Sequence, residues 1–580
     1  MEKHAESIYN NLSKERKKLQ NEGKLPLFVT TGGWQLLKSK YLNFEEQQNP
    51  SLRYKTIAAT AAKHINGLLP VFDGYKNWED AFYQMLFIDG DLSPSTPVLS
   101  NMGTSKGLPV SCSGSYVGDS IESFYDTLKE AAILSKHGFG TSAYLDVRSR
   151  GSSISTGGKA SGVVPVFENY VHMSQKVSQG SQRRGAWAGY IDIEHGDFDE
   201  IVNYVLEKPD DRNIGFCIKD EYIQKYKNGD KEANRRVAVV LKMALEVGKG
   251  YLFKSDLANK LLPVFYKNHG LKSYASNLCT EINLGINEFL TFTCVLSSLN
   301  LENWDTIVNT KKVQVATIFL DCVVSEFIEQ AKKIKGLEKA VLFTEKARAL
   351  GLGVCGFHTY LQNNLIPFSD LRASYKNNEI FKYIEQESLE ASKYMAKYLG
   401  ECELTKGYGQ RNASLRAIAP TKSTALIMGG VSEGINPFPA NTYAQKTPAG
   451  EIQRINPTLL KLLKDKNIHT KEHIDEIILN QGSVQNVPWL TKEEKNVFKT
   501  AFEIDQNVIM RYASNRQKHL DQLQSVNLFF RGMNNENYIR DVHQKFLLSD
   551  NLVTRYYVNG QRDTSGKFKS EQPVECEACQ

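Results

Sequence analysis

A short segment, Ser276 to Glu281, places an amide, a thiol and a carboxylate at alternate positions of the chain. Asn277, Cys279 and Glu281 follow one another at a spacing of two, directly before the apolar and polar run 282–286. On an extended or tightly turned backbone, residues i, i+2 and i+4 project to the same side. Their side chains would then share one small volume. This set suits radical chemistry on a sugar, in which a sulfur abstracts hydrogen, a carboxylate takes a hydroxyl proton and an amide orients both. The alternative for the triplet alone is a buried cysteine beside a surface glutamate.

The composition describes a globular chain with a sizeable core. Its 580 residues are 41% hydrophobic and 23% charged, enough for several domains or for one large α/β barrel. A formal charge of +6 is compatible with a phosphorylated substrate and does not favour nucleic acid. The most apolar stretch, 313–324, is interrupted by Gln314 and Asp321, and the N-terminus lacks the apolar core of a signal peptide. These features predict a cytoplasmic protein with no membrane partner.

The nine cysteines do not form a pattern typical of a disulfide scaffold. Their number is odd, and they are scattered over a long chain without a secretion signal. Buried thiols are common and mostly inert, so only those in special surroundings carry a functional hypothesis. The nine are Cys112, Cys217, Cys279, Cys294, Cys322, Cys355, Cys402, Cys576 and Cys579.

Periodicity and composition divide the chain into three regions. Residues 1–90 have helical spacing of apolar positions, and residues 91–550 alternate short apolar runs with Gly/Ser-rich loops and helices, which indicates an α/β core. One clear helix is predicted from Asn378 to Leu399, with Gly400 just beyond its end. The region 551–580 ends in a polar, Gly/Ser/Lys-rich segment and is expected to be a flexible tail.

Several ordered motifs together resemble the large catalytic subunit of ribonucleotide reductase. The resemblance extends from about residue 10 to the C-terminus, and together the motifs are far more specific than any one alone. They are Ser276 to Glu281, Ser111-Cys112 ahead of Asp119, Cys294 with the following Leu-Ser-x-x-Asn-Leu, 348–354, 420–424, Tyr556-Tyr557 and the terminal cysteine pair. The resemblance implies a ten-stranded α/β barrel of two five-stranded parallel halves that run antiparallel to each other. A central finger loop would present Cys279, and a helical N-terminal region would precede the barrel.

The resemblance also implies how the cysteines act. A thiyl radical on Cys279 would remove the 3′ hydrogen of a ribonucleoside diphosphate, with Glu281 as general base on the 3′ hydroxyl and Asn277 orienting both. Cys112 and Cys294 would supply the reducing equivalents and become a disulfide. Because a disulfide needs Cα atoms about 4.4–6.8 Å apart, these two cysteines, 182 positions apart in the sequence, must lie side by side.

The tail cysteines Cys576 and Cys579 match the family's shuttle, which re-reduces the buried disulfide and is itself reduced by thioredoxin or a glutaredoxin-like protein. Half of a zinc site is the alternative for Cys-x-x-Cys. No second Cys/His pair lies nearby in the sequence, so no metal is assigned to this chain. Two intervening residues are fewer than in some class I relatives, which leaves the reductant open.

The adjacent Tyr556 and Tyr557 match the class I relay that carries an electron and a proton from a partner subunit to the active-site cysteine. The resemblance therefore implies a separate small subunit that generates the radical, because this chain has no carboxylate-rich metal helix. A stacked tyrosine pair would need an irregular backbone, since neighbours on a regular strand face opposite ways. The alternative is a cobalamin-dependent reductase of the same fold, which makes its radical in place.

Two sets of residues match nucleotide-binding positions of the family. Substrate contacts are expected at Thr96, Ser111, Thr421, Ser423 and Thr424, where hydroxyls and backbone N–H groups suit phosphate. Lys422 stands where relatives often have an acidic residue, so its role is open. Effector contacts, for dNTP or ATP, are expected at Asp119, Arg148, Arg150 and Arg183.

Such a specificity site lies at a dimer interface in the family, so a homodimer is expected. The family's N-terminal ATP-cone, which switches overall activity, is not recognisable in the sequence, and we expect specificity control without cone-based inhibition. A catalytically silent nucleotide-binding regulator that kept the barrel is a further alternative. The complete set of five cysteines, Cys112, Cys279, Cys294, Cys576 and Cys579, argues against it.

Overall fold

The computed structural model describes residues 2–179, 185–447, 450–531 and 536–561, and helices joined by turns make up the region from residue 2 to residue 90. Polar caps begin three of these helices: Thr30, Asn43 and Asn77 each accept a hydrogen bond from a first-turn backbone N–H. Trp34 and Trp78 are buried in the core beneath them. The elements are α1 (Glu2–Asn21), α2 (Thr31–Lys40), α3 (Phe44–Gln48), α4 (Ser51–Ala62), α5 (Trp78–Tyr83), a π-helical turn (Gln84–Ile88) and, beyond them, α6 (Thr96–Asn101).

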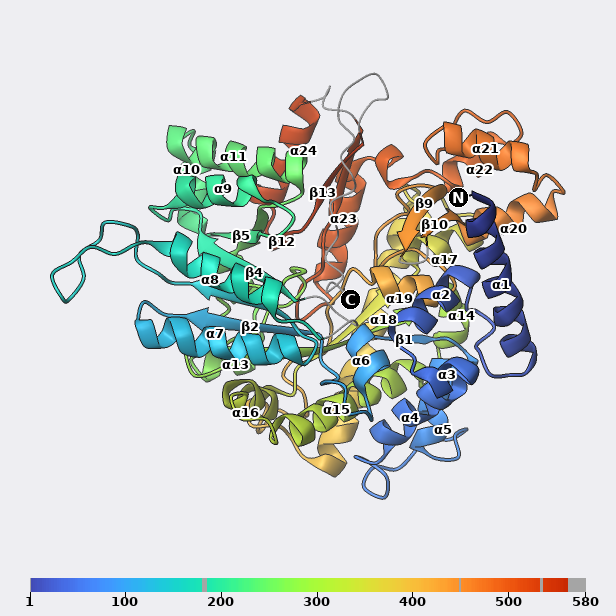
Figure 1. Ribbon diagram of the computed structural model, residues 1–580, viewed down its shortest axis with the longest axis horizontal. Helices are drawn as coiled ribbons and strands as arrows, with labels where there is room; N and C mark the ends of the chain where they lie inside the picture. Colours follow the sequence, from blue (N-terminus) through green and yellow to red (C-terminus); the bar gives the residue numbers. More distant parts are fainter. Residues whose placement is uncertain (1, 180–184, 448–449, 532–535, 562–580) are drawn as a thin grey trace.

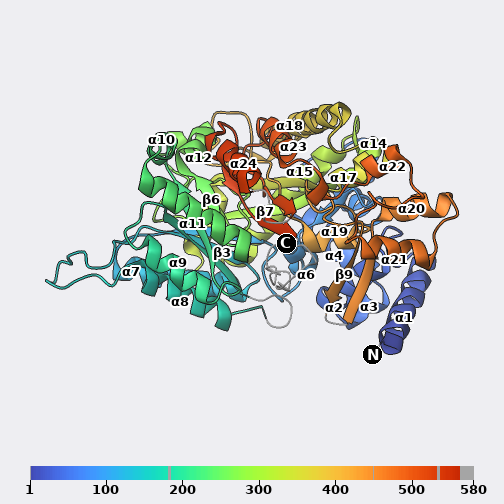
Figure 2. The ribbon, with the colours of Figure 1, turned by 90° about the horizontal axis from the view of Figure 1, so that it is seen from above.

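Five parallel strands form the first half of the main sheet, in the order β2-β3-β4-β5-β6. Their residues are almost all buried, as expected for parallel strands covered on both faces. Figure 1 shows the connecting helices along the outer side of these strands, and Figure 2 shows the same layer from above. The strands are β2 (Cys112–Val117), β3 (Gly140–Leu145), β4 (Ala186–Asp192), β5 (Asn213–Ile218) and β6 (Tyr251–Lys254); the helices are α7 (Ile121–Lys136), α8 (Val163–Lys176), α9 (Phe198–Glu207), α10 (Asp220–Lys227) and α11 (Lys231–Val247).

The other strands of this sheet reverse direction at both of its ends. The long strand β7 (Phe292–Asn300) runs antiparallel to β2 and parallel to β8 (Leu350–Cys355), while β1 (Leu92–Pro94) pairs antiparallel with β7. At the far end, β12 (Thr554–Arg555) runs antiparallel to β6. The buried helix α15 (Lys312–Ala331) packs against β7 and β8.

Backbone hydrogen bonds continue the sheet beyond β8 through two extended segments. Leu350 N donates to Ser414 O, Ile418 N donates to Leu523 O, and Tyr556 N donates to Val526 O. The predicted α/β barrel-type architecture with a helical N-terminal region is confirmed. The count of ten strands is not, because the main sheet of the described residues has nine strands, and the segments at 414–418 and 522–526 form only isolated bridges.

Side chains on the inner face of the parallel half form layers, because residues in register on neighbouring strands point to the same side. The first two layers are small, and they leave room for the segment 276–281; Ser142 Oγ donates to the Ser276 carbonyl oxygen at 3.0 Å. The layers are Cys112, Gly140 and Ala186; then Gly114, Ser142, Ala188 and Asn213; then Tyr116, Tyr144, Tyr190, Gly215 and Tyr251.

The predicted helix at 378–399 is confirmed as α18 (Leu371–Leu399), with Gly400 at its C-cap. It begins at Leu371 because Asp370 accepts a hydrogen bond from Arg372 N and caps the helix there. No helix in the described ranges combines the length and apolar character needed to cross a bilayer.

The remaining elements complete the shell around the sheet. They are α12 (Ser255–Leu261), α13 (Val264–Asn268), a 3₁₀ turn (Leu301–Asn303), α14 (Trp304–Ile307), α16 (Glu338–Ala347), α17 (Phe357–Asn363), α19 (Lys422–Ile427), β9 (Thr442–Thr447), β10 (Gly450–Ile455), α20 (Pro457–Asp465), α21 (Lys471–Leu479), α22 (Lys492–Val497), a 3₁₀ turn (Ala501–Glu503), α23 (Gln506–Gln517), β11 (Leu528–Arg531), α24 (Glu536–Leu548) and β13 (Val558–Gln561).

The small inner layers generate a stability prediction. A Cβ at Gly114 would lie 2.1 Å from the Phe292 ring, so Gly114→Ala should destabilise the protein by about 1–3 kcal/mol through overpacking. The measurement is the thermal unfolding midpoint. In the matched control Gly32→Ala, within α2, the nearest neighbour would be at an ordinary 3.5 Å, and this variant should be neutral or slightly stabilised. Equal midpoints for both variants would contradict the described packing.

Candidate active site

A closed turn carries the three residues of the Asn-x-Cys-x-Glu segment. Ser276 Oγ donates to Ile282 O at 2.7 Å and accepts from Ile282 N at 3.1 Å, which fastens the two ends of the turn together. Between them Thr280 takes a left-handed conformation with φ 68°, unusual for a β-branched residue. Such backbone strain persists only where the surroundings enforce it. The turn is therefore held in one shape by its own hydrogen bonds and by the barrel around it.

Asn277 and Glu281 contact each other directly within this turn. Asn277 Nδ2 donates to Glu281 Oε1 at 2.8 Å, and Glu281 N donates back to Asn277 Oδ1 at 3.1 Å. Ser525 adds a hydroxyl that lies 2.6 Å from the Cys279 carbonyl oxygen and 3.3 Å from Glu281 Oε2, and its one proton can be donated to either acceptor. The amide thus fixes the carboxylate, as the spacing predicts.

Burial controls the protonation of this carboxyl group. Glu281 is completely buried, and desolvation raises its pKa to about 7; the hydrogen bond from Asn277, its own backbone N–H and Ser525 oppose the rise. A carboxyl group with a pKa near neutrality exchanges a proton readily at physiological pH, which is the property required of a general base.

Cys112 and Cys294 lie directly opposite each other where β2 and β7 pair antiparallel. Opposed residues of such a pair have Cα atoms about 4.5–5.5 Å apart, within the range that a disulfide spans. Both side chains are buried, at 3% and 0% exposure. The fold therefore brings together two thiols that are distant in the sequence.

Each of these thiols receives an amide N–H. Asn277 Nδ2 lies 3.3 Å from Cys112 Sγ, and Gln522 Nε2 lies 3.4 Å from Cys294 Sγ. Burial raises the pKa of Cys294, and the hydrogen bond from Gln522 works in the opposite direction. Since Asn277 also contacts Glu281, one side chain connects the Cys279 turn with the thiol pair.

The tyrosine pair lies on an irregular backbone between two strands, and its rings are in contact but tilted by 43° rather than stacked. β12 ends at Arg555 and β13 begins at Val558, and between them the rings of Tyr556 and Tyr557 approach to 3.9 Å between centroids. Tyr251 contacts both rings, at 5.0 and 5.7 Å. Tyr556 is buried in the same apolar cluster as Cys279, whereas Tyr557 is half-buried.

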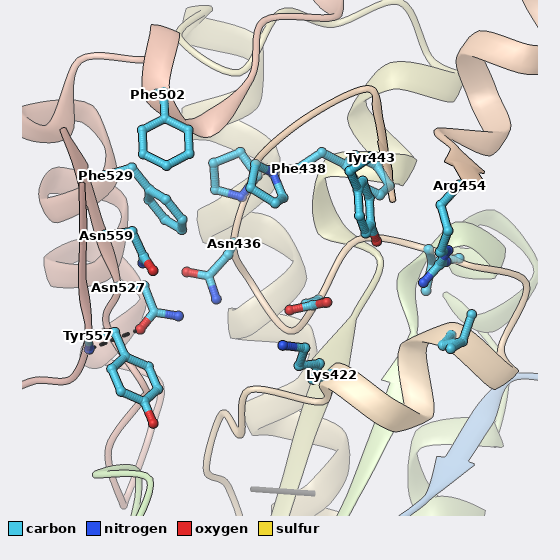
Figure 3. A pocket seen from close by; sticks show the side chains of 15 residues that line it. Lys422, Asn436, Phe438, Tyr443, Arg454, Phe502, Asn527, Phe529, Tyr557 and Asn559 are labelled. Carbon is cyan, nitrogen blue, oxygen red and sulfur yellow. Dashed lines mark hydrogen bonds between the residues drawn. The ribbon is translucent and has the colours of Figure 1, made fainter. Parts of the chain in front are cut away.

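A cavity of about 130 Å³ lies beyond Tyr557. Figure 3 shows Tyr557 and Lys422 on its wall, together with Phe438, Phe502 and Phe529. Lys422 opens α19, so the cavity extends from the tyrosine pair toward the segment expected to bind phosphate.

The expected substrate residues come from separate parts of the chain. The hydroxyls of Thr96 and Ser111 are buried and have no hydrogen-bond partner within the described residues, which fits groups that await a ligand. Thr421 takes a left-handed conformation with φ 57° ahead of α19, and its hydroxyl accepts from Gly434 N at 2.7 Å. Thr424 is buried in the first turn, and Ser423 is half-buried.

The expected effector residues gather near the ends of β2 and β3. Arg148 Nε donates to Asp119 Oδ2 at 2.5 Å, and its backbone N–H donates to Asp119 Oδ1 at 3.2 Å. Arg150 makes an exposed ion pair with Glu200 at 3.0 Å. Both arginines already contact a carboxylate, so a phosphate would have to compete for them. Arg183, Cys576 and Cys579 lie outside the described residues.

Four residues of the site are not predicted by the sequence motifs: Gln522, Ser525, Tyr190 and Tyr251. Gln522 and Ser525 reach the site because the segment at 522–526 lies beside the turn, where Leu523 N donates to Glu281 O. Tyr190 donates its hydroxyl to the Asn277 carbonyl oxygen at 2.7 Å. The pattern Asp-Gln-x-Gln-Ser at 521–525, polar within an otherwise buried stretch, is the only sequence signal that points to any of them.

One group among the described residues has the spacing of metal ligands: His64, Glu326 and Glu329. Lys63 Nζ lies 2.6 Å from Glu326 and 3.3 Å from Glu329, so an ammonium ion already neutralises the two carboxylates. His64 follows α4 in the chain, and the two glutamates lie on α15.

The interior of the helix-covered barrel thus holds a thiol pair, a third thiol on a central turn and a buried carboxylate, a set typical of an oxidoreductase. The comparisons with known proteins agree. Residues 110–235, 219–406 and 403–552 match the family model of the ribonucleotide reductase barrel domain, and residues 27–107 match that of its all-alpha domain. No cone domain is among the matched family models.

Individual relatives cover nearly the whole chain. The ribonucleoside-diphosphate reductase large subunit of Invertebrate iridescent virus 3 is 29% identical over 91% of this chain and 93% of its own. A Frog virus 3 (isolate Goorha) protein provisionally given the same name is 34% identical over 84% of this chain and 90% of its own. The solved Actinobacillus ureae class Id ribonucleotide reductase alpha subunit is 39% identical, with a TM-score of 0.83 over 92% of this chain and 98% of that one. This chain belongs to the ribonucleotide reductase large-subunit family.

The burial of Glu281 generates a prediction about stability and pH. Its pKa is about 7 when folded and 4.5 when unfolded, so between these values the folded state holds a proton that the unfolded state has lost. The free energy of unfolding of the wild type therefore falls, relative to that of Glu281→Gln, as pH rises from about 4.5 to about 7. The total fall is about 3 kcal/mol. Thermal midpoints of both proteins between pH 5 and 8 give the measurement. A constant difference across that range would contradict the raised pKa.

Proposed function

We propose that this subunit reduces ribonucleoside diphosphates to 2′-deoxyribonucleoside diphosphates by thiyl-radical chemistry. The observation that carries the proposal is the convergence of Cys112, Cys294 and the Asn277–Glu281 pair in one buried volume. Family membership supports nucleotide reduction, and the names of the viral relatives support the diphosphate as substrate.

Cys279, as a thiyl radical, abstracts the 3′ hydrogen of the bound ribose. Glu281 takes the proton of the 3′ hydroxyl, and Asn277 holds this carboxylate in position through the bond at 2.8 Å. The 2′ hydroxyl then leaves as water. Cys112 and Cys294 supply two electrons and two protons and form one disulfide, and Cys279 takes its hydrogen atom back at the end.

The radical enters from a separate small subunit through Tyr557 and Tyr556. The contact between their rings and the burial of Tyr556 with Cys279 support this direction of transfer. The cobalamin-dependent alternative has no use for a tyrosine pair that leads outward to a cavity. No radical cofactor is assigned to the chain itself.

Two further roles follow from the family. The tail thiols Cys576 and Cys579 carry reducing equivalents from thioredoxin or a glutaredoxin-like protein to the buried pair. Thr421, Ser423 and Thr424 hold the diphosphate with Thr96 and Ser111, whose unpartnered hydroxyls support this role.

Effector nucleotides bind near Asp119 and select the substrate base. Asp119 binds the effector's sugar, while Arg148, Arg150 and Arg183 bind its phosphates. The exposed apolar side chains of Ile121 and Tyr125 on α7, beside this site, support a homodimer that forms over the helix.

The first prediction from this proposal concerns the buried thiols. CDP reduction with dithiothreitol and the small subunit should be lost in Cys279→Ser, Cys112→Ser and Cys294→Ser, because each removes an electron carrier. The rate of CDP reduction by Glu281→Gln should be about 10²–10⁴-fold lower than that of the wild type, as expected for removal of a general base. Cys402→Ser, a buried thiol outside the site, is the matched control and should keep its activity.

Three results would overturn parts of the proposal. Activity in Cys279→Ser would favour the silent-regulator alternative, in which this thiol has no role. Turnover by the isolated chain with adenosylcobalamin would favour the cobalamin-dependent class. Reduction of CTP in preference to CDP would overturn the diphosphate assignment.

A second prediction separates the tail thiols from the buried ones. The double variant Cys576→Ser, Cys579→Ser should turn over at the wild-type rate with dithiothreitol and lose multiple turnover with thioredoxin. Small thiols reach the buried disulfide directly, whereas a protein reductant does not. Full activity of the double variant with thioredoxin and thioredoxin reductase would exclude the shuttle.

A further inference from the structure

The third layer inside the parallel half of the barrel consists of tyrosines. Tyr116 on β2, Tyr144 on β3 and Tyr190 on β4 occupy the same register position on neighbouring strands. Gly215 and then Tyr251 follow in register on β5 and β6. Residues in register on adjacent strands project to the same side, so these tyrosines share one face across five strands, and they are called the tyrosine belt below.

One end of this tyrosine belt contacts the proposed radical relay. Tyr251 lies 5.0 Å from Tyr556, measured between ring centroids. The gap at Gly215 is covered by the ring of Tyr190, since a Cβ at Gly215 would lie 2.3 Å from that ring. Tyr190 in turn donates its hydroxyl to the Asn277 carbonyl oxygen, within the turn that carries Cys279.

The other end of the belt leads away from the site to half-buried rings. Tyr116 and Tyr144 are 6.2 Å apart, and Tyr274 contacts both of them, at 4.6 and 5.8 Å. The hydroxyl of Tyr116 donates to Asp146 Oδ2 at 2.5 Å. This belt end therefore has a carboxylate in position to accept the phenolic proton.

Packing alone does not explain such a layer. Inward positions of an α/β barrel are usually filled by Val, Ile and Leu, because a phenol inside a barrel must be desolvated and needs a hydrogen-bond partner. Burial raises the pKa of Tyr144 and of Tyr116, so neither ring ionises at neutral pH. A neutral phenol loses an electron most readily when a base takes its proton at the same time, and Asp146 is such a base.

We propose that the tyrosine belt is a branch of the radical pathway. A radical that has not reacted with substrate is transferred along it from the relay to Tyr116. The inference rests on the proposed function, which supplies the oxidant as a tyrosyl radical on Tyr556. One electron passes from Tyr116 along the belt to Tyr556, and the phenolic proton of Tyr116 moves to Asp146. Tyr556 regains its proton from the half-exposed Tyr557, which takes one from solvent.

The radical left on Tyr116 is close enough to solvent for repair by a small-molecule thiol. The thiol gives one hydrogen atom to the Tyr116 oxygen, Asp146 releases its extra proton to solvent, and two of the resulting thiyl radicals combine to a disulfide. The active-site thiols are thereby spared oxidation when no substrate is bound.

The inner tyrosines make this branch slower than the productive path. The Tyr190 hydroxyl donates a hydrogen bond to a carbonyl oxygen, and a carbonyl oxygen does not take up the proton. Oxidation of Tyr190 is therefore energetically unfavourable. Cys279 lies in the same buried cluster as Tyr556, so transfer to Cys279 needs no passage along the belt. The branch therefore competes only when the productive path has no substrate to react with.

Photo-oxidation of the chain alone tests the branch without the small subunit. A thiol-linked ruthenium photo-oxidant is attached through Asn559→Cys, on the cavity wall beside Tyr557, in full-length chain that also carries Cys576→Ser and Cys579→Ser. A nitroso spin trap then marks the tyrosines on which radicals form, and mass spectrometry of peptides locates the adducts.

The expected result is an adduct on Tyr116 whose yield falls about tenfold in Tyr144→Phe. An increase of only about 1.4 kcal/mol in the barrier to radical transfer is sufficient for that change. Tyr398→Phe, an exposed ring near the end of α18, is the matched control and should leave the adduct unchanged. Adducts confined to Tyr556 and Tyr557, or a Tyr116 adduct equally strong in Tyr144→Phe, would overturn the inference. Because no nucleotide reduction is measured, failure of the proposed function leaves this result intact.

A second measurement uses the reconstituted enzyme with its small subunit. Tyr116→Phe should keep the initial rate of CDP reduction and lose activity about tenfold faster during incubation with effector but no substrate. Equal lifetimes of the variant and the wild type would contradict a protective branch. Absence of CDP reduction in the wild type would instead contradict the proposed function.

Discussion

The antiparallel pairing of β2 with β7 is the constraint on which the site depends. It places Cys112 opposite Cys294, and a slip of one residue in this register would turn one of the two thiols to the other face of the sheet. The same register fixes Gly114 opposite Phe292, where a side chain on residue 114 would collide with the ring. A sheet contact and a steric limit therefore hold the thiol pair in place together.

The remaining geometry is built onto this pair by a few polar side chains. Asn277 connects Cys112 with Glu281, and Gln522 contacts Cys294 from the opposite direction. In a buried volume each such hydrogen bond is stronger than in water, and each unmade one is costlier. The network thus fixes the site, while the Thr96 and Ser111 hydroxyls have no hydrogen-bond partner in the described residues.

Sequence patterns predicted those parts of the site that lie close together along the chain. The spacing of Asn277, Cys279 and Glu281 predicts a shared volume, and the Tyr556–Tyr557 pair predicts an interrupted strand; the structure shows the contact between Asn277 and Glu281 and the interruption. The α/β architecture and the helical N-terminal region also follow from periodicity. Ser525 and Gln522 escaped prediction because short polar residues within a buried segment look the same whether they contact backbone or a catalytic group.

The sequence by itself determined the family, the local turn around Cys279 and the identities of the thiols, because these depend on residue type and short spacing. The tertiary structure decided which distant residues meet: Cys112 with Cys294, Gln522 with Cys294, and the tyrosines of four separate strands in one layer. It also decided that the pKa of Glu281 is about 7, since desolvation depends on the whole barrel closing over the carboxylate. Strand register and burial are collective properties of the packed chain, and no local pattern encodes them.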